Sequence, residues 1–132
     1  QLSLAQNLSL SGVIVVTTPQ TTAVEVAIRG AGLFEKLNIP IWGVAENMSY
    51  WDPQNTGERR YVFGQGGGQK AAQQLKTPLL GQIPLEESLR AGGDYGSPIV
   101  VDQPQNPAAE AFRKIAQQLL QERLLPAVLA AP

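Results

Sequence analysis

The chain has 132 residues, a hydrophobic fraction of 43% and a net charge of −1, which suits one domain with a buried core. It contains no cysteine and no histidine, so disulfides, thiolate or imidazole metal sites and Ser-His catalysis are excluded for this chain. No basic excess favours nucleic acid or an anionic membrane, and no apolar run approaches the roughly 18 residues of a membrane span. Because the chain begins with Gln1 and its only methionine is Met48, we expect it to be a piece of a longer protein.

The first part of the chain predicts two strands around a helix. Residues 13–16 form a continuous β-branched run, which is typical of a strand buried on both faces in a parallel sheet. Apolar residues at helical spacing predict a helix over residues 22–38. After Pro40, a second strand is expected over residues 41–46.

The rest of the chain predicts a long polar loop followed by alternating short elements. Asn106 and Pro107 give the last helix a clear start, as cap and first position. In chain order the expected elements are a loop over 47–68, a helix over 69–76, a strand over 79–84, one or two helical turns over 86–91 closed by Gly92 and Gly93, an extended segment over 99–101, and a helix over 107–125.

Strands that alternate with helices predict an α/β fold with a mostly parallel sheet and flanking helices. Ligands of such sheets bind outside the carboxyl ends of the strands. Three loops follow predicted strand ends, at residues 17–20, 46–49 and 84–87. If the strands are neighbours, these loops meet at one edge of the sheet.

Two of these loops carry side chains suited to a purine base. The Asn47 amide offers a donor and an acceptor in one plane, which can pair with an adenine edge. The alternative is an asparagine that fixes its own turn. Pro84 and Leu85 could wall a flat base, and Glu86 could accept a hydrogen bond from the ribose or base. The alternative for Glu86 is an interaction with a helix dipole.

Other motifs favour structural roles. Residues 63–70 are glycine-rich, but Gln69 stands where a Walker A loop needs glycine before its lysine. A flexible connector is the favoured interpretation, with anion binding at the following helix as the alternative. Arg59 and Arg60 are interpreted as a solvated loop pair, and the two tryptophans as packing residues. The apolar stretch 124–131 lacks the basic face of a membrane anchor.

Five strings resemble one family in order and spacing. The family is the Mrp-type P-loop ATPases, relatives of MinD and ParA, which are proposed to carry or assemble iron–sulfur clusters. The pairing of ENMSY with FGxGGG is specific to this branch. The strings are VVTTPQ at 15–20, GVAENMSY at 43–50, FGQGGG at 63–68, LGQIPL at 80–85 and RAGGDYGSPIV at 90–100.

The resemblance implies a cytoplasmic, dimeric ATPase of which residues 1–132 are the C-terminal portion of one domain. Its Walker A loop, switch segments and Mg ligands would lie upstream of Gln1, and residues 47–68 would be a family-specific loop. The ATP adenine would be bordered by Asn47, Pro84, Leu85 and Glu86. This segment would hold no catalytic residue and no metal ligand, so we expect no ATP hydrolysis by the segment alone. The implied partners are a second copy, as a homo-oligomer, and iron–sulfur client proteins, with neither nucleic acid nor membrane.

One departure from the family bears on the cluster. Many members have Cys-x-x-Cys between ENMSY and FGxGGG, and these positions fall at Pro53 and Thr56 here. Neither side chain can ligate iron as a thiolate does, which argues against cluster carriage by this segment. Two alternatives stay open. One is a non-catalytic protein-interaction module that uses loop 47–68, and the other is a MinD-like positioning ATPase, which the non-basic tail disfavours.

Overall fold

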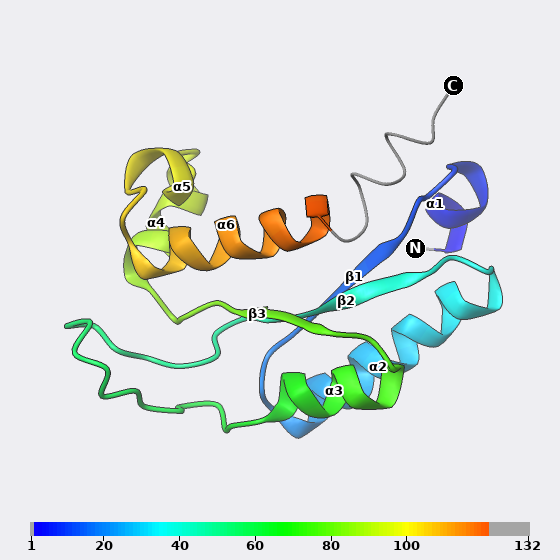
Figure 1. Cartoon of the computed structure of the whole chain (residues 1–132), viewed down its shortest axis with the longest axis horizontal. Coiled ribbons are helices and arrows are strands. Elements are labelled where there is room, and N and C mark those ends of the chain that lie inside the picture. The colour runs from blue at the N-terminus through cyan, green and yellow to red at the C-terminus, as the bar shows by residue number, and fades with distance from the viewer. Residues whose placement is uncertain (1, 122–132) are drawn as a thin grey trace.

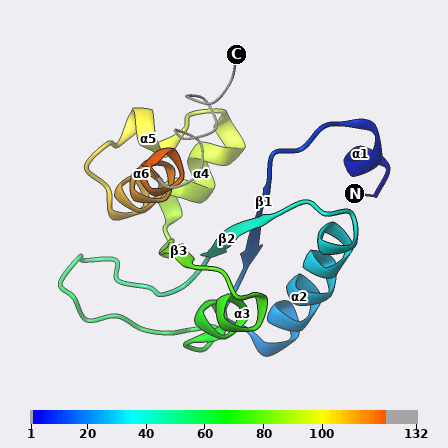
Figure 2. The ribbon, with the colours of Figure 1, turned by 45° about the vertical axis from the view of Figure 1, so that its right-hand side comes forward.

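The computed structural model describes residues 2–121. It is an α/β fold with a three-stranded parallel sheet in the order β1-β2-β3, which confirms the predicted fold class. Helices α2 and α3 cover one face of the sheet, and α6 lies on the other beside α4 and α5 (Figures 1 and 2). The elements are α1 (Leu2–Asn7), β1 (Val13–Thr17), α2 (Thr21–Lys36), β2 (Ile41–Glu46), α3 (Gly67–Leu75), β3 (Leu79–Gln82), α4 (Glu87–Tyr95), α5 (Ile99–Asp102) and α6 (Pro107–Leu119).

The central strand β2 sends alternate side chains into two cores, as a pleated strand must. Val44 packs beneath α2 and α3 in a cluster with Val15 and Val24. Its neighbour Ala45 points to the other face and joins a second cluster beneath α6. Both faces of β2 are therefore covered, and its carboxyl end is held in a fixed position in the middle of the sheet.

Two predictions for the region before α6 are wrong. Residues 99–101 were expected to be extended, but they form the short helix α5, in which buried Ile99 packs on Ala108 and Ala109. The helix expected over 86–91 continues through both glycines to Tyr95 and ends at Gly96, whose φ of 75° is left-handed. Tertiary packing overrides strand propensity in the first case, and Gly96 provides the end of the helix in the second.

The expectation of burial on both faces also fails for β1. Val15 and Thr17 are buried towards α2, whereas Ile14 and Val16 on the other face are 36% and 60% exposed. β1 is an edge strand in the described part of the chain, because it pairs with β2 alone. The expected helical residues 122–125 and the apolar stretch 124–131 lie outside the described residues.

Candidate functional site

The three loops expected to converge do so at the carboxyl ends of the neighbouring strands. The Asn47 N–H donates to the Thr17 carbonyl at 2.7 Å, which joins the ends of β1 and β2. The Ile83 N–H donates to the Glu46 carbonyl at 2.8 Å, and the Ser49 N–H donates to the Ile83 carbonyl at 2.9 Å. The backbone thus fixes the relative positions of all three loops.

Asn47 lies at this junction, half-buried at the end of β2. Its Oδ1 accepts a hydrogen bond from the Met48 N–H at 2.9 Å, and Met48 has a left-handed φ of 52°. The turn-fixing role considered for Asn47 is therefore present. Oδ1 retains a second lone pair and Nδ2 retains two donors, so the same side chain still has hydrogen-bonding capacity for a ligand.

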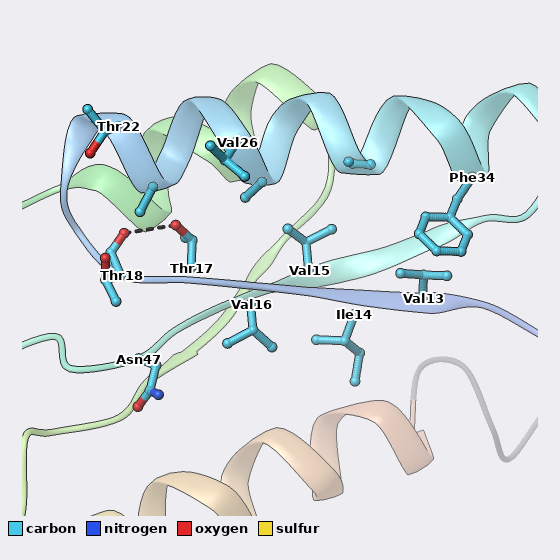
Figure 3. A pocket seen from close by; sticks show the side chains of 14 residues that line it. Val13, Ile14, Val15, Val16, Thr17, Thr18, Thr22, Val26, Phe34 and Asn47 are labelled. Atoms are coloured by element: carbon cyan, nitrogen blue, oxygen red, sulfur yellow. Dashed lines mark hydrogen bonds between the residues drawn. The ribbon is translucent and has the colours of Figure 1, made fainter. Parts of the chain in front are cut away.

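A groove of about 690 Å³ follows the free edge of β1, with α2 on one side of the strand and Ile14, Val16 and Asn47 on the other (Figure 3). Most of its wall is apolar, from Val13 to Val16 on the strand and from Val26 and Phe34 on the helix. Thr17, Thr18 and Thr22 lie at the same end of the groove as Asn47. The Thr17 hydroxyl donates a hydrogen bond to the Thr18 carbonyl at 2.9 Å. The polar end of the groove thus coincides with the converging loops.

The structure separates the other three predicted residues from this groove. Pro84 is buried, while Leu85 and Glu86 line a different cavity of about 500 Å³ together with Trp51 and Pro53. The Leu85 N–H donates to the Tyr50 carbonyl at 2.7 Å. Leu85 and Glu86 therefore border loop 47–66, and Asn47 alone of the four predicted residues lines the groove along β1. Glu86 precedes α4 without a side-chain capping bond.

Sequence reasoning missed Glu46, which is 1% exposed. Its carboxylate accepts hydrogen bonds from the Ser49 hydroxyl at 2.5 Å, the Gly68 N–H at 2.5 Å and Gln82 Nε2 at 3.3 Å. Ser49 is fully buried beside it. A glutamate at the end of an apolar strand was the available signal, because a buried carboxylate requires partners.

The glycine-rich segment is packed rather than a flexible connector. Gly67 and Gly68 are buried in the first turn of α3, and a Cβ on Gly67 would collide with the Pro19 carbonyl. The Gly68 N–H, which could have received an anion, is already bound by Glu46. The alternative of a phosphate site therefore loses this donor to an internal carboxylate.

Loop 47–66 is organised by aromatic and carboxylate contacts. Trp51 and Arg60 form an antiparallel bridge, and the Arg60 guanidinium lies 5.6 Å from the Trp51 ring centroid. The Arg59 guanidinium lies 3.9 Å from the ring centroid of Tyr50. Such cation–π contacts hold both arginines against the loop. Trp51 is 37% exposed, so the expected burial of tryptophan applies to Trp42, which packs beneath α6, more than to Trp51.

Asp52 closes a turn within this loop. Partial desolvation raises the pKa of its carboxyl, but hydrogen bonds from the Gly57 and Thr56 N–H groups and the Thr56 hydroxyl, with the charge of Arg59, outweigh it and lower the pKa below its ordinary value. Within residues 2–121, no group of three or more Asp, Glu, His or Cys side chains is placed to hold a metal ion.

Comparison with solved structures defines the class of the fold. The chain superposes on the MinD cell division protein of Aquifex aeolicus with a TM-score of 0.62 and 28% identity, over 83% of this chain and 43% of that chain. A nucleotide-binding protein in complex with ADP from Archaeoglobus fulgidus gives a TM-score of 0.63 and 28% identity, over 83% and 44%. The class is that of MinD-like P-loop ATPase folds.

No helix among residues 2–121 is long and apolar enough to cross a membrane.

The sequence comparisons then give the family. The family "ParA: NUBPL iron-transfer P-loop NTPase" matches residues 1–120, and the chain belongs to it. The iron-sulfur cluster carrier protein of Synechocystis sp. is 47% identical over 120 residues, which are 90% of this chain and 34% of that protein. The iron-sulfur cluster transfer protein NUBPL of Mus musculus is 38% identical over 120 residues, which are 91% and 38%. The chain thus spans about a third of the length of these relatives.

Proposed function

We propose that this chain is the adenine-side, C-terminal portion of an ATP-binding protein that transfers iron–sulfur clusters. The observation that carries the proposal is the Asn47 amide at the junction of β1 and β2, with its oxygen oriented by the Met48 N–H. Family membership supports the nucleotide, and the names of the relatives support the cluster as the cargo.

A fixed amide discriminates between purines at position 6. With Oδ1 anchored on the Met48 N–H, its second lone pair can accept from the 6-amino group of adenine while Nδ2 donates to a ring nitrogen. A 6-oxo purine would place an acceptor against Oδ1. Asn47 therefore favours adenine over hypoxanthine, and it carries the base contact of this proposal alone, because Leu85 and Glu86 line a separate cavity.

The remaining chemistry belongs to residues outside this chain. ATP supplies the free energy of phosphoryl transfer, but residues 2–121 present no group of three or more carboxylate, histidine or cysteine side chains that could hold Mg²⁺. In this proposal the Walker A loop and Mg ligands are upstream, the intact protein is a cytoplasmic homodimer, and the segment alone is inactive. The loop at Pro53 and Thr56 contributes contacts to clients rather than thiolate ligands.

The test uses the intact protein that contains this segment, with Asn47→Ala. ATP affinity should fall by roughly tenfold, since one bidentate base contact is worth about 1–3 kcal/mol. Affinity for inosine triphosphate should hardly change, because that nucleotide lacks the 6-amino group. Gln54→Ala, another loop amide, is the matched control. Equal loss for both nucleotides, or no loss for either, would contradict the assignment of Asn47.

A further inference from the structure

The buried carboxylate of Glu46 is the least expected group in the structure. Burying a carboxylate costs several kcal/mol unless hydrogen bonds replace its hydration. Glu46 receives three of them, from the Ser49 hydroxyl, the Gly68 N–H and Gln82 Nε2. Every buried side-chain polar atom among the described residues has a partner, so this network is complete. A complete network of this kind fixes the groups that belong to it.

The network links two motifs that are separate in the sequence. Glu46 and Ser49 belong to ENMSY, whereas Gly68 ends FGQGGG. Glycine is needed at position 68, because a Cβ there would lie 2.7 Å from Glu46 Oε2. The loop of residues 47–67 therefore begins and ends at the same carboxylate. In this contact one motif supplies the acceptor and the other the donor.

Glu46 also holds the turn that contains Asn47. The Ser49 hydroxyl binds Glu46 Oε1, so the two residues between them, Asn47 and Met48, form a closed turn. Within this turn Met48 adopts a left-handed φ of 52°, which costs free energy for a residue with a side chain. Without the carboxylate, the turn can relax to a more favourable backbone and the Asn47 amide loses its fixed direction.

We propose that Glu46 is a positioning residue that sets the purine selectivity of Asn47 by clasping Ser49 and Gly68. This inference rests on the proposed function of Asn47 as the base reader. Glu46 itself is too buried to touch a nucleotide. Glu46 affects the base through the orientation of the Asn47 amide. The base site therefore depends on the contact of Glu46 with Gly68 at the end of the loop.

The test is Glu46→Gln in the intact protein, with affinities for ATP and inosine triphosphate measured side by side. A glutamine of the same shape cannot accept all three hydrogen bonds, so the preference for ATP should fall roughly threefold to tenfold. In the Asn47→Ala background, Glu46→Gln should cause no further change in the preference, since both act through one group. Glu58→Gln, an exposed glutamate of the loop, is the matched control.

The outcomes separate the two proposals. If Glu46→Gln folds with a lower melting temperature but an unchanged preference, Glu46 is merely structural and the positioning role is overturned. If Asn47→Ala leaves the preference unchanged, the base-reader proposal fails and the positioning role fails with it. If Glu46→Gln does not fold, Ser49→Ala removes one bond of the clasp and should lower the preference. An unchanged preference in folded Ser49→Ala would also overturn the positioning role.

Discussion

At the scale of single residues, Asp52 shows how this chain closes a turn without metal ligands. Its carboxylate accepts from the Gly57 N–H at 2.8 Å and the Thr56 N–H at 3.1 Å. These bonds enclose Pro53 and Thr56, the positions at which many members of the family are expected to carry cysteines. Hydrogen bonds from backbone donors to a charged acceptor hold such a turn together. The loop can therefore keep its shape although it lacks thiolates.

This arrangement predicts a pH dependence of the turn. The pKa of Asp52 is lowered in the folded state, so the ionised carboxylate stabilises the turn at neutral pH, and this contribution is lost as pH falls through the folded pKa. The amide proton shifts of Thr56 and Gly57 should titrate together by NMR, with a midpoint below about 3.9, the ordinary value of aspartate. Asp52→Asn should abolish this titration. A midpoint at or above the ordinary value would contradict the prediction.

The candidate site was predicted only as far as single residues carry their own chemistry. Asn47 could be found because its amide is suited to a base edge wherever it lies after a strand. For Glu46 the sequence offers only its place at the end of an apolar strand, because its partner Gly68 is 22 positions away and only the tertiary fold brings them together. The separation of Asn47 from Leu85 likewise depends on how loop 47–66 lies between the strand ends. The type of a residue predicts which hydrogen bonds its side chain can make, and tertiary packing decides which side chains are brought together.

At the scale of elements, the sequence predicted the helices and strands whose formation depends on local signals. The three strands and helices α2, α3 and α6 were predicted because buried runs, helical spacing and the Asn106 cap are local signals; the Ala108 N–H does donate to Asn106 Oδ1 at 2.9 Å. Helix α5 was missed because Ile99 is held by contacts with α6 rather than by a neighbouring strand. The end of α4 was misplaced because the left-handed residue that ends the helix is Gly96, whereas Gly92 and Gly93 both have negative φ inside it.

The two adjacent glycines of α4 should respond to alanine in opposite ways. A Cβ on Gly92 would collide with the Ser97 carbonyl, where the Ser97 N–H donates to the Gly92 carbonyl at 2.8 Å to close the helix end. Gly92→Ala should therefore destabilise the protein by about 1–3 kcal/mol. Gly93 is exposed and a Cβ there meets nothing within 4 Å, so Gly93→Ala should stabilise it by about 0.5–1 kcal/mol.

Chemical denaturation of both variants measures these changes, and each variant serves as the control for the other. The same sign for both would contradict the structural distinction. A lower free energy of unfolding for Gly93→Ala would show that the backbone at position 93 needs glycine. That result would be expected if the helix ended at the glycine pair.

At the scale of the whole molecule, the sheet is covered unevenly. α2 and α3 cover β2 and β3 on one face and α6 covers them on the other (Figure 2). In the described part of the chain β1 and β3 are both edge strands, but only β1 also has an open apolar face. Val13–Val16 has the composition of an interior strand, but in the described part of the chain it is an edge strand with one exposed apolar face. A pattern within the strand carries no information on which residues cover its faces.

An apolar strand with unpaired backbone groups is prone to pair with another chain. We therefore expect the purified 132-residue chain to self-associate, with a weight-average mass above 14.1 kDa that rises with concentration in sedimentation equilibrium. Val16→Lys should return it towards the monomer mass, because a charge on the open face opposes association there. Val62→Lys is the matched control, since Val62 is also 60% exposed but lies on loop 47–66. A monomer at all concentrations would contradict the prediction. Dispersal by Val62→Lys alone would place the association surface on the loop, and β1 would then have no part in it.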